Sequence, residues 1–272
     1  MISMKHVHHH PRHIALTYPA SVRQHFYLLL IGPLVLALVV YLIASAYQLP
    51  HTPAPLSPAQ LLSATLATIV RIAVAYVASV LIAVPLAIFA TKTKTLERIF
   101  LPVFDILGSV PILAFFPVVV LVFVRFDFPE GAAVFILFLN ILWNIVFTVV
   151  GGLKIIPKDI VYAAKIFGLT GWSYTRRLIL PAIFPQLVVG SILAVAEGWN
   201  LVIVAEALHT YIPHGDPSQD LFGIGSILVQ AAANSQNGVF IAALIIMVLF
   251  IGVFNLLVWQ RLLTISQRFR FD

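Results

Sequence analysis

The stretch from residue 162 to residue 190, YAAKIFGLTGWSYTRRLILPAIFPQLVVG, stands apart from the rest of the chain. It is the one long segment that is neither a very apolar run nor a terminal tail. It carries basic residues, paired prolines and Gly168, and it lies between two strongly apolar segments. Such an insert predicts a folded element outside a membrane, and the rest of the chain indicates on which side it lies.

The composition excludes a soluble globular protein. Hydrophobic residues make up 61% of the 272 residues and charged residues make up 10%, against about 25% charged in an average globular protein. A soluble fold of this size cannot bury so much apolar surface, so lipid is the expected solvent. The chain has no cysteine, which excludes disulfides and thiolate metal sites. The expected fold class is an all-α membrane protein.

Six apolar segments are long enough to cross a membrane, which takes about 20 residues in a helix. We expect a tail at 1–25, a first span and connector within 26–60, a core at 61–260 and a second tail at 261–272. The first apolar run lacks a small-residue cleavage site and is expected to remain as an anchor. The expected spans are 26–47, 61–90, 101–124, 132–151, 187–208 and 239–259.

The positive charges predict how these spans are oriented. Fourteen of the 16 Lys and Arg residues lie in the two tails, the loop at 92–98 and the insert at about 154–185. Six spans place all of these segments on one face, and the positive-inside rule makes that face cytoplasmic. Both termini and the insert are therefore expected in the cytoplasm. The net charge of +6 is then an orientation signal and does not indicate a nucleic-acid partner.

The insert has the local signals of two short helices joined by a corner. Pro157 suits the first turn of a helix, and Gly168 can end that helix. Thr170 can cap a second helix that runs through Arg177 and stops near Pro181. The corner would expose small residues, which permit close approach by another protein; they are Ala163, Ala164 and the turn residues around Gly171.

The same residues carry a resemblance to a known family. Ala163-Ala164-x3-Gly168, followed by Ile179-Leu180-Pro181 and Pro185-x4-Gly190, resembles the EAA loop of type I, binding-protein-dependent ABC-importer permeases. The wider resemblance is to permeases for nitrate, sulfonate, taurine and bicarbonate, and to one unit of a duplicated anion permease. Further matching segments are 65–71, 84–86, 110–117 (VPILAFFP), 198–200, 204–206 and 223–225. Tyr162 stands where the family usually has Glu, and Gly108 stands where it often has Arg.

This resemblance implies a permease subunit that is not itself an enzyme. The implied pathway for a small anion forms with a second permease copy or a paralogue. Two separate ABC ATPase subunits would bind ATP and grip the coupling loop, and a periplasmic binding protein would deliver the substrate. The implied location is the bacterial inner membrane, among its lipids. The implied coupling residues are Tyr162, Ala163, Ala164, Gly168, Gly171 and Pro181.

Four polar residues within the spans are candidates for the pathway: Arg71, Asn144, Glu197 and Asn200. Arg71 would either attract an anionic substrate or form a structural ion pair with Glu197 or Glu206, because a charge in a span needs a partner or water. Glu197 would either contact substrate or tie helices together. Asn144 belongs to a stripe with Asn140 and Thr148 that favours hydrogen bonds between helices.

Two groups of basic residues could each serve one of two roles. Arg176 and Arg177 would contact either the ATPase or lipid headgroups. The histidines between His6 and His13 are typical of a metal-binding tract or of a polar tail.

The sequence holds no P-loop, HExxH or nucleophile motif, so no catalytic or metal site is predicted. A secondary transporter or channel that works alone is the second function compatible with the spans. A scaffold without a pathway is the third.

Overall fold

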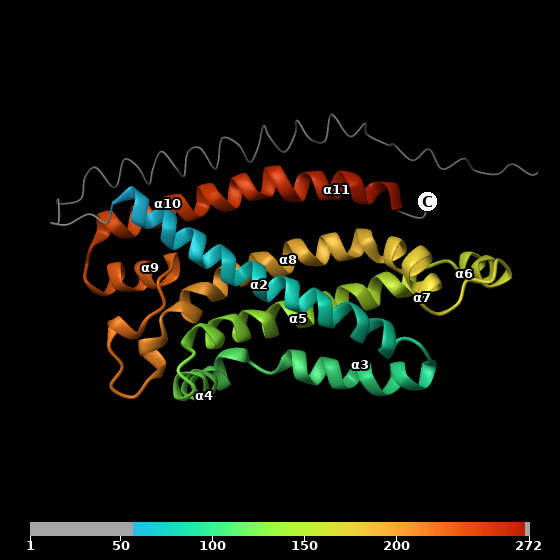
Figure 1. The fold of residues 1–272 in the computed structure, drawn as a ribbon, viewed down its shortest axis with the longest axis horizontal. Helices are drawn as coiled ribbons and strands as arrows, with labels where there is room; N and C mark the ends of the chain where they lie inside the picture. The colour runs from blue at the N-terminus through green and yellow to red at the C-terminus, as the bar shows by residue number, and fades with distance from the viewer. Residues whose placement is uncertain (1–56, 270–272) are drawn as a thin grey trace, which may run out of the picture. The chain divides into compact units, whose positions relative to one another are not determined.

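The computed structural model describes residues 57–269, and this part of the chain is helical apart from short turns. The helix labels begin at α2 (Figure 1). The predicted tail at 1–25 and the first predicted span, 26–47, lie outside the described residues. So does the histidine tract.

Three long helices form the centre of the described part: α2 (Pro58–Ala90), α5 (Pro129–Ile155) and α8 (Leu180–Glu206). α2 begins at a capping box, in which Ser57 and Gln60 exchange hydrogen bonds between side chain and backbone. α5 packs mainly on α8 and α2. Its face towards them is fully buried, and this apolar seam holds the bundle together; it comprises Ile136, Leu137, Ile141, Ile145, Val146 and Val149.

The prediction of one continuous helix for the third span, 101–124, is wrong. The segment consists of α3 (Lys94–Ser109) and α4 (Ile112–Arg125), bent by 78° with respect to each other. The break falls at Val110, whose backbone is extended because a following proline disfavours the helical conformation. Pro111 itself supplies no N–H to continue the α3 hydrogen-bond ladder. Pro102 and Pro117 lie inside helices without ending them.

The insert forms a corner, as predicted, but its second helix does not stop near Pro181. α6 (Lys158–Ile166) ends before Gly168, and α7 (Gly171–Tyr174) leads through a π-helical turn, Thr175–Ile179, directly into α8. The continuous element is Gly171–Glu206. The π turn changes the pattern of backbone hydrogen bonds just before Pro181. The helix can therefore accommodate a proline, which has no N–H to donate. The expected fifth span, 187–208, therefore covers only part of this helix.

The remaining helices complete the described part. A loop with two short 3₁₀ turns, Leu208–Tyr211 and Pro217–Gln219, joins α8 to α9 (Ile224–Ala233). α10 (Asn237–Phe254) continues through a second π turn, Asn255–Trp259, into α11 (Gln260–Ser266) and a last 3₁₀ turn, Gln267–Phe269. α6 and α9 lie at opposite ends of the bundle (Figure 1).

Within residues 57–269, four helices are long and apolar enough to cross a membrane: Pro58–Ala90, Pro129–Ile155, Gly171–Glu206 and Asn237–Phe269. The bent pair α3 and α4 makes five if it is a single span. The described part is thus a multi-pass, all-helical membrane protein.

Candidate functional site

A buried ion-pair cluster joins three segments at the end of the bundle opposite the corner. Arg71 of α2 donates from Nη1 to Glu206 Oε1 at 2.7 Å, and from Nε and Nη2 to the two oxygens of Glu130 at 2.6 and 2.7 Å. Glu206 ends α8 and is 0% exposed, while Glu130 lies in the first turn of α5. Arg71 is 6% exposed. The guanidinium of Arg71 is therefore paired with two carboxylates.

The start of α9 completes the cluster from the other side. Gly225 donates its backbone N–H to Glu206 Oε2 at 2.8 Å, and Thr68 donates its hydroxyl to Oε1 at 2.6 Å. Thr68 in turn accepts the N–H of Ile224 at 3.0 Å. A helix N-terminus favours a carboxylate, because its free N–H groups point at the anion. Each Glu206 oxygen is thus satisfied in a site without solvent.

Glycine is required where α9 meets Glu206. A Cβ on Gly223 would overlap the Glu206 carboxylate, and a Cβ on Gly225 would lie 2.7 Å from the carbonyl oxygen of Val202. The predicted Gly223-Ile224-Gly225 segment is therefore a contact that lets a backbone N–H reach a buried carboxylate. Of the two predicted partners of Arg71, Glu206 is confirmed and Glu197 is wrong. Glu130 is a partner that the sequence did not indicate.

A second set of polar residues, here called the polar face, lies where α5 meets α8. Asn144 donates from Nδ2 to Glu197 Oε2 at 2.6 Å, so the predicted hydrogen bond between helices is present. Asn200 lies one turn beyond Glu197 on α8 and is exposed. Asn140 lies one turn from Asn144 on α5, and its buried Nδ2 has no partner within the described residues. These four residues make up the polar face.

The exposed side of α8 differs from that of α2. On α8 it is apolar at Val189 and Leu193 and becomes polar at Glu197 and Asn200. On α2 one exposed stripe is entirely apolar: Leu66, Val70, Val74, Val77 and Leu81. An ionisable residue within a span faces a protein interior or a water-filled cavity, not lipid. The α2 stripe suits lipid, whereas the polar face does not.

Small residues bring α8 close to α5 beside the polar face. Gly190, Ala194 and Gly198 recur every four residues and are all buried. A Cβ on Gly190 would lie 2.6 Å from Cβ of Thr148 on α5. Thr148 donates its hydroxyl hydrogen to the carbonyl oxygen of Asn144 at 2.6 Å. This stripe of small residues therefore holds Asn144 within reach of Glu197.

The corner depends on two glycines in the left-handed region. Gly168 has φ +70° and Gly171 has φ +53°, a conformation that costs other residues about 1–2 kcal/mol. Neither glycine has an atom within 4 Å of its Cβ position. Glycine is therefore needed at these two positions for the backbone conformation and not because space is short. Thr170 occupies the cap position of α7, but its side chain makes no capping bond.

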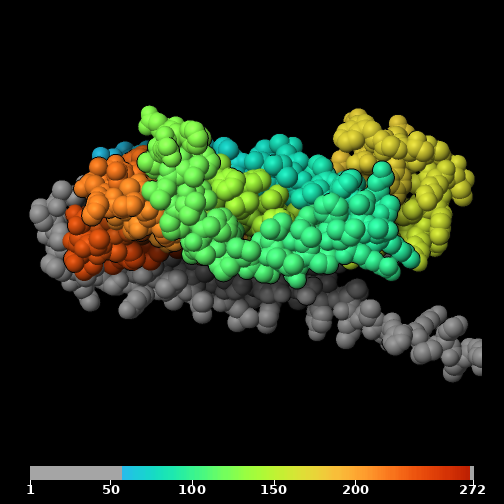
Figure 2. Space-filling view, turned by 90° about the horizontal axis from the view of Figure 1, so that it is seen from below, coloured from blue at the N-terminus to red at the C-terminus, as the bar shows by residue number. Residues whose placement is uncertain are grey.

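The surface of the corner is apolar and exposed. Ile166, Phe167 and Trp172 are 83%, 82% and 72% exposed, and Tyr162 is also exposed. Ala163 is exposed as predicted, but Ala164 is buried, so the corner does not present both alanines. Figure 2 shows the corner in yellow, standing out from one end of the described part. We call Ile166, Phe167 and Trp172 the corner tip.

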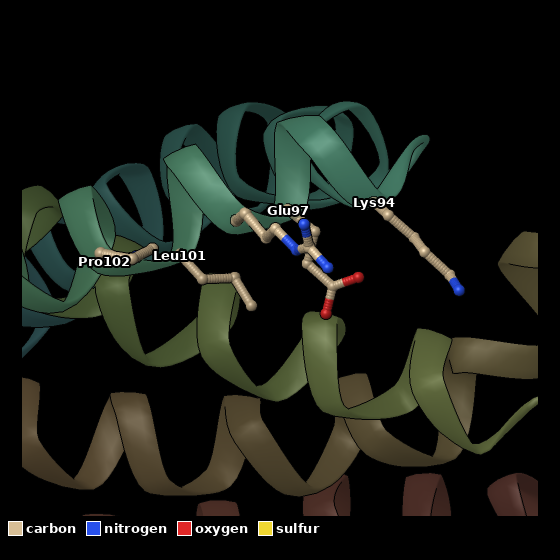
Figure 3. A pocket seen from close by; sticks show the side chains of 5 residues that line it. Lys94, Glu97, Leu101 and Pro102 are labelled. Carbon is tan, nitrogen blue, oxygen red and sulfur yellow. The ribbon is translucent and has the colours of Figure 1, made fainter.

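An open pocket of about 500 Å³ lies beside α3 and not at the polar face. Its lining is Lys94, Glu97, Arg98, Leu101 and Pro102 (Figure 3). Glu97 points towards the neighbouring helix, where it forms an ion pair of 2.7 Å with Lys154 in the last turn of α5. Both side chains are partly exposed, and the pair ties α3 to α5 near the corner.

The loop between α8 and α9 is held by polar contacts of its own. Nδ1 of His209 lies 2.7 Å from one carboxylate oxygen of Asp220. Gln230 of α9 donates to the other oxygen at 3.2 Å. The backbone N–H of Ser218 lowers the pKa of the exposed Asp216 carboxyl, which caps the 3₁₀ turn at 217–219. Within residues 57–269, no group of three His, Asp or Glu side chains could hold a metal ion.

The family model described as "Binding-protein-dependent transport system inner membrane component" matches residues 83–263. The chain belongs to this family. The match includes the polar face, the corner and Glu206, and it leaves out Arg71. This inner-membrane component is therefore a type I ABC-importer permease by family, as the resemblance predicted.

Named relatives are similar to part of the chain. The chain is 26% identical over 191 residues to the nitrate import permease protein of Leptolyngbya laminosa, covering 70% of this chain and 62% of that protein. It is 26% identical over 193 residues to the bicarbonate transport system permease protein of Synechococcus elongatus, covering 71% and 64%. The taurine transport system permease protein of Escherichia coli is 25% identical over 142 residues, covering 52% and 50%. The chain thus spans less than two thirds of the first relatives that it matches.

The structure brings some of the predicted pathway residues together and separates another. Asn144, Glu197 and Asn200 share the polar face, whereas Arg71 lies in the ion-pair cluster. The sequence did not indicate the Arg71–Glu130 contact because the predicted span begins only after Glu130, whereas Glu130 occupies the first turn of α5. An acidic residue just after Pro129 is a helix-start signal that would have placed it correctly.

Proposed function

We propose that this chain is the transmembrane subunit of an ATP-driven importer for a small anion, and that the corner couples it to a separate ATPase. The family match supports an inner-membrane transport component. The names of the relatives support cargo in the nitrate, bicarbonate or taurine class. A second permease chain and a periplasmic binding protein complete the proposed assembly.

The proposed topology has six spans with both termini in the cytoplasm. The four spanning helices and the bent pair α3 and α4 supply five of the spans, and 26–47 supplies the first. The corner then lies in the cytoplasm and α9 at the outer face. The distribution of Lys and Arg supports this orientation. In this arrangement the polar face lines the pathway, and a second permease chain covers it.

The observation that carries the coupling role is the exposed corner tip. Three large apolar side chains on a corner fixed by two glycines lie beyond the ends of α5 and α8. Aromatic residues that are exposed in one chain are typical anchors in the pocket of a partner. The absence of Glu at Tyr162 fits a contact dominated by apolar burial. Docking should therefore persist at high salt, because apolar contacts are not screened.

Co-purification with the cognate ATPase tests this role. Phe167→Ser and Trp172→Ser should each weaken ATPase association and lower ATP-driven uptake by about tenfold or more, since hot-spot residues contribute about 2 kcal/mol or more. Phe222→Ser is the matched control, because Phe222 is similarly aromatic and exposed but lies at the other end of the bundle. Undiminished ATPase association in both tip variants would contradict the proposal, as would equal uptake without any ATPase.

A further inference from the structure

The carboxylate of Glu197 occupies an unusual position for a pathway that carries simple anions. Glu197 lies nine residues before Glu206, which is about 13 Å along the helix and so well inside a hydrocarbon layer of about 30 Å. It is exposed on the face of α8 that does not suit lipid. An anion that passes this point would meet a negative charge.

Glu197 is incompletely satisfied within the described residues. Its Oε2 accepts the Asn144 amide, whereas its Oε1 has no hydrogen-bond donor there. On α5, one turn from Asn144, the buried Nδ2 of Asn140 also has no partner within the described residues. The amide of Asn144 fixes the direction of the carboxylate without neutralising it. A charge at this depth of a membrane needs a partner or a water-filled cavity, so this carboxylate is open to a cation that arrives through the pathway.

No cation of the described residues is placed to neutralise Glu197. Arg71 is the positively charged residue within the described spans that is far from a helix end, and it is already held by Glu130 and Glu206. The other described Lys and Arg residues lie in loops or towards the ends of helices. The segment 26–47 contains no charged residue. In a second copy, residues 57–269 therefore bring a second carboxylate to the pathway and no matching cation.

We propose that Glu197 binds a positively charged amino group of the cargo, so that the cargo is a small zwitterion carrying both an ammonium and an anionic group. Asn144 holds the carboxylate in place, and the exposed Asn200 offers an amide group to the cargo one turn further along α8. This inference rests on the proposed transport function and narrows its substrate class. Cargo that lacks a protonated nitrogen would leave the carboxylate unpaired during passage.

Uptake of paired probes tests the inference in membranes that hold the chain with its cognate ATPase and binding protein. The probes are 2-aminoethanesulfonate against ethanesulfonate, 3-aminopropionate against propionate, and nitrate and bicarbonate. At least one amine-bearing probe should enter tenfold or more faster than its amine-free analogue. Glu197→Gln keeps the size of the side chain and its bond from Asn144, and should lower that uptake by tenfold or more. Glu97→Gln removes a carboxylate of the same size outside the polar face and should leave uptake unchanged.

The outcomes separate this inference from the proposed function. ATP-driven uptake restricted to amine-free probes, or full uptake of an amine-bearing probe by Glu197→Gln, would refute the inference and leave the transport function standing. Uptake of none of the six probes would also refute it, while ATPase co-purification would still decide the coupling role. If Glu197→Gln separates the permease chains yet transports normally per assembled complex, the residue serves the interface between chains and the inference is wrong.

Discussion

Removal of the Arg71 guanidinium should destabilise the protein strongly, because Glu206 would be left charged in a site without solvent. Arg71→Gln deletes three charge-assisted hydrogen bonds and leaves Glu206 with Thr68 and Gly225 as donors. Breaking a buried pair by removing one partner costs about 3–5 kcal/mol. Glu130→Gln is the matched comparison. The Glu130 side chain is 47% exposed and its amide oxygen can still accept from Arg71, so its cost should be about 1 kcal/mol or less.

Equilibrium unfolding in mild detergent, followed by the fluorescence of the four tryptophans, measures these costs. The double variant Arg71→Gln/Glu206→Gln should be no less stable than Arg71→Gln alone, because it removes the unpaired charge together with its former partner. Uptake per folded molecule should be unchanged in Glu130→Gln. A loss below about 1 kcal/mol for Arg71→Gln, or additive losses in the double variant, would refute the view of Arg71 as a structural ion-pair residue.

Three further predictions concern particular contacts. Gly168→Ala should lower ATP-driven uptake and cost about 1 kcal/mol, since its φ is +70°. Gly151→Ala, inside α5 with open space at its Cβ position, should leave uptake unchanged and cost no stability in the same assays. Gly190→Ala should cost about 1–3 kcal/mol through overlap with Thr148, against no loss for Gly252→Ala in unfolding experiments; equal stability of the two would contradict the close α5–α8 contact. Because the chain has no native cysteine, Asn200→Cys should react with a charged thiol reagent and Val77→Cys in the α2 stripe should not; the reverse pattern would place lipid at the polar face.

Much of the helical framework could be predicted from apolar run length and local signals. Gly168 marks the corner through its backbone conformation, whereas the expected span 61–90 begins three residues after α2 does at Pro58. The break at Val110 could not be assigned in advance. Three prolines with the same local chemistry lie in the segment, yet Pro111 interrupts it while Pro102 and Pro117 lie inside helices.

The site was predictable only in part for a similar reason. Arg71 needed a partner, and the sequence offered Glu197 and Glu206 without choosing between them. Which carboxylate pairs with Arg71 depends on which helix faces meet. Gly223 and Gly225 let α9 approach Glu206, and Glu206 is the partner that the structure shows. The continuation of α7 into α8 depends on a π turn, for which the sequence carries no recognised signal. Helical spacing predicted the Asn140 and Asn144 side of the polar face, whereas the contact of Asn144 with Glu197 on α8 was not predicted.

The coupling role of the corner is tested most directly by a photo-crosslinking amino acid placed at Phe167 in native membranes. Phe167 is 82% exposed, so the probe should not disturb the fold. The predicted result is one main adduct, in which mass spectrometry identifies a subunit that carries a P-loop, and no such adduct from the same probe at Phe222. Crosslinks from Phe167 to lipid alone, or the same ATPase adduct from both positions, would contradict the account.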